Sequence, residues 1–173
     1  MIIVCSGLVR SASTLQFNIL RVMMEQHYGE VNSGFHQEVE LYDNLPNVIK
    51  VHDNIEELAN KADLMFTTIR VRVGVRDSIK RINKWDDTLD PDKVEGMMIG
   101  WLWWAERADF IQTYKETHNM HKLIRRYIDF LQFDLDPQKV LNQVEREMKD
   151  PGDEHIKKHD PQTLLHHKHK SEW

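Results

Sequence analysis

Short apolar runs of strand length alternate with segments of helical periodicity along most of this 173-residue chain. The runs are short and contain few polar residues, which is typical of strands that are buried on both faces of a sheet. They cover residues 1–5, 45–51, 64–69 and 110–114, and the helical segments cover 14–28, 55–61, 76–85, 91–108, 121–131 and 137–148. Asn54 and Asp90 are expected to cap the helices that follow them. The pattern predicts an α/β fold, a three-layer sandwich with a parallel sheet of about four to five strands between helices.

Composition excludes several classes of protein. Apolar residues make up 40% and charged residues 29% of the chain, and the net charge of −5 argues against a nucleic-acid-binding protein. One cysteine excludes a disulfide framework and a multi-cysteine metal site. No apolar run approaches the ~18 residues of a membrane span, and no basic stretch precedes the first run. We therefore expect a cytoplasmic protein with no membrane partner, a single domain over residues 1–173, and leave its oligomeric state open, a homo-oligomer included.

The loop between the first strand and the first helix has the character of an anion-binding loop. Residues 7–14 read Gly-Leu-Val-Arg-Ser-Ala-Ser-Thr. A helix N-terminus at the carboxyl end of a strand offers free N–H groups and a positive dipole to a phosphate. The Walker pattern fits only at Gly7 and Thr14, because Ala12 replaces its second glycine and Ser13 its lysine. Without that lysine, cleavage of ATP or GTP is not expected.

Cys5 and Arg10 suggest a second interpretation of the same loop. Small protein tyrosine phosphatases carry C-x5-R-[ST] between a strand and a helix, whereas here the spacing from Cys5 to Arg10 is one residue shorter. Asp150 or Asp160 could be offered as the general acid. The shorter loop would not wrap a phosphate in the same way, so this alternative is disfavoured, and Cys5 is expected to be a buried residue that ends a strand.

Two further pairs of residues follow this loop at the ends of later strands. Lys50 and His52 lie two residues apart, and alternation in a strand would place both on one face. Arg70 ends the run 64–69, and Ser78 follows eight residues later. A local excess of basic residues around them suits a ligand with several phosphate charges: Arg70, Arg72, Arg76, Lys80 and Arg81.

In their order and spacing, these motifs resemble those of the PAPS-dependent sulfotransferase family. The family's loop P-[KR]-S-G-[ST]-[ST] is similar to residues 9–14, its K-[ST]-H strand end to residues 50–52, and its arginine–serine pair to Arg70 and Ser78. Residues 130–137, Phe-Leu-Gln-Phe-Asp-Leu-Asp-Pro, also resemble the family's FLG-x-x-L stretch. The resemblance implies a P-loop NTPase-like topology and transfer of a sulfuryl group from PAPS to an acceptor hydroxyl or amine.

The resemblance also implies a role for each matching residue. His52 would be the catalytic base, with Lys50 and Arg10 stabilising the transferred group. The 5′-phosphosulfate of the donor would lie on the loop, and Arg70 with Ser78 would hold its 3′-phosphate. The residues of the loop in contact with the donor would be Arg10, Ser11, Ala12, Ser13 and Thr14. No metal is implied, and the acceptor would be a small molecule, a glycan or a peptide.

The chain departs from the family in several places. Val51 replaces the serine or threonine of K-[ST]-H, and Val71-Arg72 follows Arg70 where the family often has Asp-Pro. No glycine-rich stretch follows Gly152, and the chain is shorter than typical members. A non-catalytic PAP- or nucleotide-binding or assembly protein with the same fold is therefore an open alternative.

Two further segments carry candidate functional residues, the histidine-rich end of the chain and a cluster of three tryptophans. Residues 150–173 form a polar tail that we expect to be partly irregular, and a metal site is not favoured there despite its histidines, His155, His159, His166, His167 and His169. Trp101 lies on the apolar stripe of its helix and is expected in the core. Trp103 or Trp104 is a candidate for the border of the acceptor cleft.

Overall fold

The computed structural model describes residues 1–82, 90, 93–149 and 162–164. Five strands form one sheet in which every pair is parallel, in the order β2-β3-β1-β4-β5. They are β1 (Ile2–Cys5), β2 (Asn32–Phe35), β3 (Asn47–Lys50), β4 (Leu64–Ile69) and β5 (Phe110–Thr113). The predicted α/β fold with a parallel sheet is confirmed. Because all strands run the same way, their carboxyl ends meet at one edge of the sheet, where ligands bind in open α/β folds.

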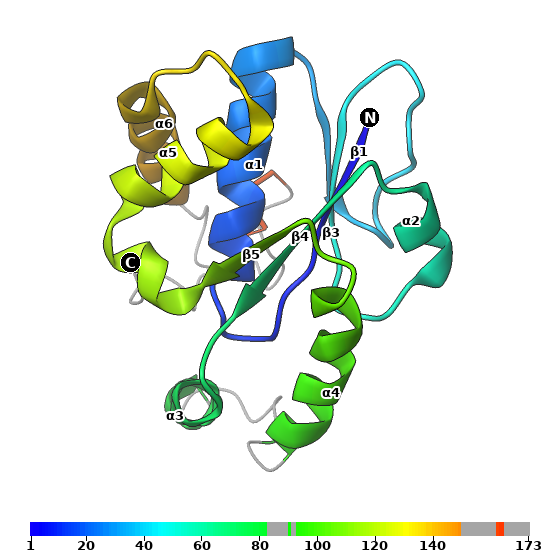
Figure 1. Cartoon of the computed structure of the whole chain (residues 1–173), viewed down its shortest axis with the longest axis vertical. Coiled ribbons are helices and arrows are strands. Elements are labelled where there is room, and N and C mark those ends of the chain that lie inside the picture. Colours follow the sequence, from blue (N-terminus) through cyan, green and yellow to red (C-terminus); the bar gives the residue numbers. More distant parts are fainter. Residues whose placement is uncertain (83–89, 91–92, 150–161, 165–173) are drawn as a thin grey trace, which may run out of the picture.

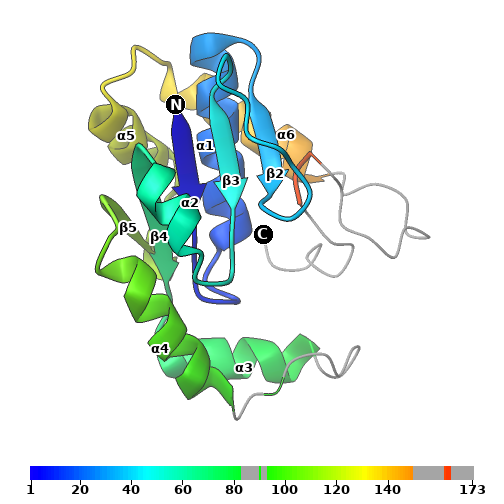
Figure 2. The same ribbon diagram turned by 90° about the vertical axis from the view of Figure 1, so that its right-hand side faces the viewer.

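Helices cover both faces of the sheet and its carboxyl edge. In Figure 1, α1 (Ser13–Tyr28), α5 (Met120–Leu131) and α6 (Pro137–Lys149) lie on one side, and α2 (Glu56–Lys61) and α4 (Val94–Ala105) on the other. Figure 2 shows α3 (Arg72–Ile82) and α4 beyond the carboxyl ends of the strands. A short 3₁₀ helix, η2 (Tyr114–His118), links β5 to α5.

The core is divided by the sheet. The larger cluster lies between the sheet and α1, α5 and α6, and it includes Phe17, Phe66 and Tyr127, all fully buried. A smaller cluster on the opposite face contains Val4, Ile49 and Trp104. A third joins Leu8 of the first loop to α3 and α4. This third cluster ties the first loop to the two helices beyond the sheet edge.

One strand, one helix start and two helix caps differ from the prediction. Strand β2 was not predicted, because Asn-Ser-Gly-Phe is a weak strand sequence and β2 pairs only with β3. Helix α3 begins at Arg72 rather than Arg76. The residues expected to cap α2 and α4, Asn54 and Asp90, do not do so: the N-cap positions are held by Ile55 and Lys93, neither with a side-chain cap.

Two expectations about the chain as a whole remain untested. None of the helices in the described part combines the length and apolar composition that a bilayer-crossing helix needs, and cytoplasmic location stays a prediction. The tail histidines and the acid candidates Asp150 and Asp160 lie outside the described residues. Within the described part, no group of three or more His, Cys, Asp and Glu could hold a metal ion.

Candidate active site

The loop between β1 and α1 is pressed against β4. A Cβ atom on Gly7 would lie 2.2 Å from Thr68 Oγ1 and 2.7 Å from Ser13 Cβ, so only glycine fits there. The hydroxyl of Ser11 hydrogen-bonds to the Leu8 carbonyl and to the Thr68 hydroxyl. Ser11 is fully buried, and its hydroxyl holds the loop in place in this structure. The backbone N–H of Ser11 also donates to the Leu8 carbonyl, over 3.1 Å, so both polar donors of Ser11 hold the loop together in this structure.

Two residues of this loop adopt a left-handed backbone. Arg10 has φ 62° and Ala12 has φ 72°, a region that side-chain-bearing residues rarely occupy. Ala12 is also the N-cap residue of α1, and no acidic residue follows in the first turn. Both residues lie immediately before α1, a helix of 16 residues whose N-terminal dipole favours an anion.

Arg10, Arg70 and Ser78 are brought together from three elements. Arg10 Nε donates to Ser78 Oγ over 3.1 Å, and Arg70 Nη1 donates to the Arg10 carbonyl over 3.2 Å. Ser78 is fully buried on α3, whereas Arg10 and Arg70 are half-buried. The sequence pattern placed Arg10 with the 5′ group and Arg70 with Ser78, and here Arg10 contacts both Arg70 and Ser78.

Sequence reasoning missed two neighbours of Arg70. The Arg70 guanidinium lies 3.7 Å from the centre of the Tyr114 ring, a cation–π contact. A Cβ atom on Gly74 would lie 2.8 Å from Arg70 Nε, so the glycine leaves room for the side chain. Tyr114 comes 44 positions after Arg70 in the sequence, and no local pattern connects them.

Lys50 is a buried ammonium group beside α1. Its Nζ donates to Thr14 Oγ1 and lies 5.2 Å from the centre of the Phe35 ring. Burial lowers the pKa of Lys50 to about 7; the Cys5 side chain opposes this shift and the Arg10 guanidinium adds to it. Lys50 thus lies beside the loop between β1 and α1, where it would have to be to stabilise a group bound by that loop.

His52 lies just beyond the end of β3 and is exposed. Desolvation by its neighbours, followed by the Lys50 ammonium, lowers the pKa of His52 below its usual range, and a hydrogen bond with the Gly7 backbone works the other way. Because the residue as a whole stays exposed, this desolvation is partial. The direction of the shift leaves the imidazole neutral at pH 7, the form that can accept a proton.

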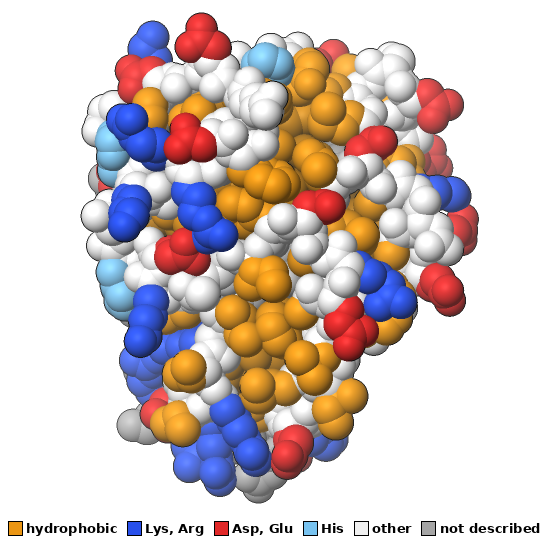
Figure 3. Space-filling view, in the orientation of Figure 1, with side chains coloured by type: hydrophobic (Ala, Val, Ile, Leu, Met, Phe, Trp, Pro, Cys, Tyr) orange, Lys and Arg blue, Asp and Glu red, His pale blue; other side chains and the backbone are white. Residues whose placement is uncertain are grey.

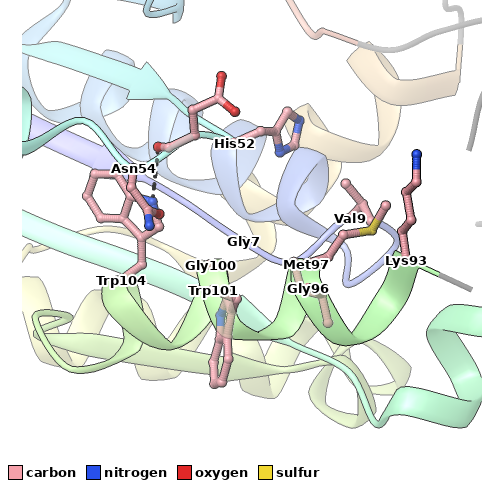
Figure 4. Close-up of a pocket in the computed structure, with 12 residues that line it drawn as sticks. Gly7, Val9, His52, Asn54, Lys93, Gly96, Met97, Gly100, Trp101 and Trp104 are labelled. Atoms are coloured by element: carbon pink, nitrogen blue, oxygen red, sulfur yellow. Dashed lines mark hydrogen bonds between the residues drawn. The ribbon is translucent and has the colours of Figure 1, made fainter. Parts of the chain in front are cut away.

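A pocket of about 720 Å³ opens beside His52. It lies between the first loop, the residues that follow β3, and one face of α4 (Figure 4). Lys50 and His52 were expected to face one common cleft. Only His52 lines this pocket, and Lys50 does not. Of the two tryptophans predicted as candidates for the border of an acceptor cleft, Trp104 lines this pocket, as does Trp101. Trp103 lies against the Arg107 guanidinium instead. Whether an acceptor binds there stays a prediction.

Cys5 does not have the properties of a nucleophile. It ends β1, is fully buried, and burial raises the pKa of its thiol far above the usual range, against the pull of Lys50. A reactive cysteine needs access and a lowered pKa. The structure therefore favours the packing role over the phosphatase alternative.

The charges at this edge of the sheet suit an anionic ligand. Arg10 lowers the pKa of Lys50, and Lys50 lowers that of His52, so the cations of the site repel one another. An anion with several charges would relieve this repulsion. The Arg, Lys, Ser and Thr side chains brought together here have the chemistry of a phosphate or sulfate site.

Comparisons with known proteins support this assignment at the level of fold. No family model matches the chain, and no curated protein matches it either. Among solved structures, the mouse sulfotransferase SULT7A1 complexed with PAP is similar, with a TM-score of 0.63 and 12% identity over 88% of this chain and 68% of that chain. The five-stranded parallel sheet and its flanking helices therefore have the P-loop-like fold of a sulfotransferase.

Proposed function

We propose that the protein is a PAPS-dependent sulfotransferase. The observation that carries the proposal is the contact between Arg10, Arg70 and Ser78, which joins the loop after β1 to the end of β4 and to α3. A donor with phosphate groups at both its 5′ and 3′ positions needs basic groups from separate elements at one place. The similarity to a PAP-complexed sulfotransferase supports the same donor.

The residues at the sheet edge divide into two groups. Ser13, Thr14 and the backbone N–H groups at the start of α1 would bind the 5′-phosphosulfate, and Lys50 would reach it from beside Thr14. Arg70 and Ser78 would bind the 3′-phosphate. Arg10, in contact with both groups, would turn from Ser78 toward the transferred group when the donor binds.

His52 would act as the general base. The acceptor oxygen attacks sulfur, the bond between sulfur and the 5′-phosphate oxygen breaks, and PAP leaves with that electron pair. The acceptor proton passes to the neutral imidazole. Lys50 and Arg10 would stabilise the negative charge that develops on the leaving phosphate oxygen.

Nucleotide binding and transfer test the proposal separately. PAP at 100 times its Kd should stabilise the protein by about 2.7 kcal/mol, a Tm rise of roughly 5–10 °C. ATP with magnesium should stabilise it far less, because ATP lacks the 3′-phosphate. Equal stabilisation by ATP would contradict the proposal, and PAP binding with no transfer to any acceptor would favour the non-catalytic alternative.

A further inference from the structure

The end of β2 brings an aromatic ring to two of the residues assigned to the transfer. Strands β2 and β3 are parallel, and in their register Phe35 is the partner of Lys50. Side chains alternate between the two faces of a sheet, so partners in register lie on the same face. The centre of the Phe35 ring lies 5.2 Å from Lys50 Nζ and 5.8 Å from the centre of the His52 ring. Phe35 therefore contacts both Lys50 and His52.

The backbone and the packing around Phe35 fix the position of this ring. The His36 N–H donates to the Lys50 carbonyl over 3.0 Å, directly beyond the last pair of the two strands. A Cβ atom on Gly34 would lie 2.6 Å from Val39 Cγ1, so the segment after β2 packs closely on the strand. Phe35 itself is half-buried against the main core cluster, on the face that α1 covers. The ring is thus held beside Lys50 by its own strand.

The ammonium group of Lys50 has few groups that compensate its charge. Among the residues that the structure describes, Thr14 Oγ1 is its only hydrogen-bond acceptor and no carboxylate forms an ion pair with it. The titratable and charged groups that face it are Cys5 on β1, Arg10 on the first loop and His52 beyond β3. Burial keeps the Cys5 thiol protonated, and the other two groups offer no negative charge.

The Phe35 ring supplies part of the missing compensation. The face of an aromatic ring carries partial negative charge, and an ammonium group within about 6 Å of its centre is attracted to it. The attraction is larger where the cation is removed from water, and Lys50 is only 2% exposed.

We propose that Phe35 is a positioning residue of the anion site: its ring holds the Lys50 ammonium group, in the charged form, beside the start of α1. Phe35 acts through Lys50 and is assigned no contact with the donor. The inference rests on the proposed sulfotransferase function for what Lys50 does, whereas the effect of Phe35 on Lys50 can be measured in the free protein.

Replacing the ring by an aliphatic side chain tests this effect directly. Burial lowers the pKa of Lys50 to about 7, and the ring opposes this by favouring the charged form. Phe35→Leu should therefore weaken the protonation of Lys50 about tenfold, as loss of a desolvated cation–π contact would. NMR of isotope-labelled lysine side chains measures it, with the Lys50 signal identified by its loss in Lys50→Met. Phe35→Met should give the same result, and Phe35→Tyr, which keeps a ring, should leave the titration unchanged.

PAP binding gives a second measurement, one that a loss of packing would not reproduce. If the charged Lys50 binds the 5′-phosphate, tenfold weaker protonation from a pKa of about 7 reduces the binding-competent fraction about ninefold at pH 8 and about twofold at pH 6. Phe35→Leu should raise the Kd of PAP by these factors. In a Lys50→Met background, Phe35→Leu should change the Kd of PAP no further, because the group through which it acts is gone.

Phe133 provides the matched control. Like Phe35, it is half-buried and packs against the main core cluster, but its ring stacks on His27, with 4.0 Å between the ring centres. Phe133→Leu makes the same change in the same cluster without removing a ring from Lys50. It should leave the titration of Lys50 and the pH dependence of PAP binding as they are in the wild type.

The possible results distinguish failure of the inference from failure of the function. An unchanged titration of Lys50 in both Phe35→Leu and Phe35→Met would overturn the inference, whether or not PAP binds. Equal weakening of PAP binding at pH 6 and pH 8, or the same shift in Phe133→Leu, would also overturn it, because both are effects of packing. A wild-type protein that does not bind PAP would instead overturn the proposed function, and weaker protonation of Lys50 in Phe35→Leu would still support the contact.

Discussion

Lys50 is an ammonium group kept inside the protein near an anion-binding loop. Burial lowers its pKa to about 7, so at pH 8 most of the native molecules carry a neutral Lys50. A bound 5′-phosphate beside Thr14 would favour the charged form and raise this pKa again. Lys50 would therefore gain its charge together with the ligand that needs it.

Proton uptake on nucleotide binding follows from this. At pH 8, PAP binding should take up close to one proton, measured as the dependence of calorimetric binding enthalpy on the ionisation enthalpy of the buffer. Uptake should disappear in Lys50→Met. Binding of PAP to the wild type with no proton exchange would show that Lys50 is already charged in the free protein or that the phosphate does not reach it.

The same shift predicts a pH-dependent stability of the free protein. Because the pKa of Lys50 is lower in the folded state than its ordinary value of 10.5, the unfolded chain binds more protons between about pH 7 and 10.5. The free energy of unfolding is therefore unaffected by this group above about pH 10.5. It decreases as the pH falls from there, and the loss is complete once the pH has passed through about 7. The Tm of Lys50→Met, relative to the wild type, should accordingly be higher at pH 6 than at pH 10; an equal difference at both pH values would contradict the shift.

Base and anchor can be separated by two substitutions. His52→Ala should lower kcat by roughly 10²-fold or more, the usual effect of removing a positioned general base, with PAP affinity little changed. Arg70→Ala should weaken PAP binding by about 1.5–3 kcal/mol, the scale of a hydrogen bond to a charged group. It should weaken adenosine 5′-phosphosulfate far less, because that donor has no 3′-phosphate. If His52→Ala removes PAP binding and Arg70→Ala does not, the two roles are wrongly assigned.

At the scale of single residues, sequence spacing predicted which polar side chains lie near one another better than it predicted what surrounds them. Arg10, Lys50, Arg70 and Ser78 are found together at the sheet edge, as their order in the chain suggested. The contact of Tyr114 with Arg70 could not be predicted, because it depends on how η2 packs beside the end of β4. Their catalytic and binding roles stay predictions.

Among the elements, β5 shows how an open sheet edge is protected. β5 pairs with β4 alone, so its other side is an edge of the sheet. Glu116 accepts hydrogen bonds from the Thr113 N–H and hydroxyl, and Arg126 donates to the Ile111 carbonyl and to Glu116. This pair covers the outward backbone groups that could otherwise pair with another chain.

Removing the pair should expose the edge. The double variant Glu116→Ala/Arg126→Ala should self-associate more than the wild type, because Ile111 and its neighbours would offer free backbone groups beside an exposed apolar side chain. Light scattering at increasing protein concentration measures this. Glu57→Ala/Lys61→Ala, which removes an exposed ion pair from α2 and likewise leaves the net charge unchanged, is the matched control; equal self-association in both variants would show that loss of an ion pair, rather than exposure of the β5 edge, is the cause.

Elements with strong patterns were predicted well, and those with weak ones were not. β4 was predicted with its observed limits, Leu64–Ile69, since its six residues are apolar or threonine and suit a buried strand. Helix α3 was predicted to begin too late, because Val71, Val73 and Gly74 are poor helix formers and tertiary packing overrides their preference. β2 is short and at the sheet edge, so its sequence has little apolar pattern to detect.

At the scale of the whole molecule, charge is distributed unevenly although the net charge is −5. Lys and Arg side chains gather at the lower end of the face in Figure 3, where α3 carries the exposed residues Arg72, Arg76, Lys80 and Arg81. The same end of the molecule holds the proposed donor site. A basic region beside the site would attract a polyanionic nucleotide despite the acidic total.

The face of the sheet covered by α1 is held together by contacts from distant parts of the chain. Arg21 on α1 is fully buried and pairs with Glu25 and with Glu147 of α6. Residues 162–164 also reach this helix, where the Asn18 side-chain amide donates to the Thr163 carbonyl over 2.7 Å. Leu164 belongs to the main core cluster. A polar tail was predicted from residue 150, so this return to the core was missed, because Thr-Leu-Leu is too short to be recognised within a His-rich segment.

Leu164 should therefore contribute to stability as a core residue does. It is 2% exposed, so Leu164→Ala should lower the free energy of unfolding by about 2–4 kcal/mol, the effect of removing a large side chain from a packed cluster. Leu102, which is 50% exposed on α4, gives the matched control, and Leu102→Ala should change stability by no more than about 0.5 kcal/mol. Urea unfolding followed by circular dichroism compares the two with the wild type. Should Leu164→Ala unfold at the same urea concentration as Leu102→Ala, residues 162–164 do not pack on α1 in solution, and the core ends with α6.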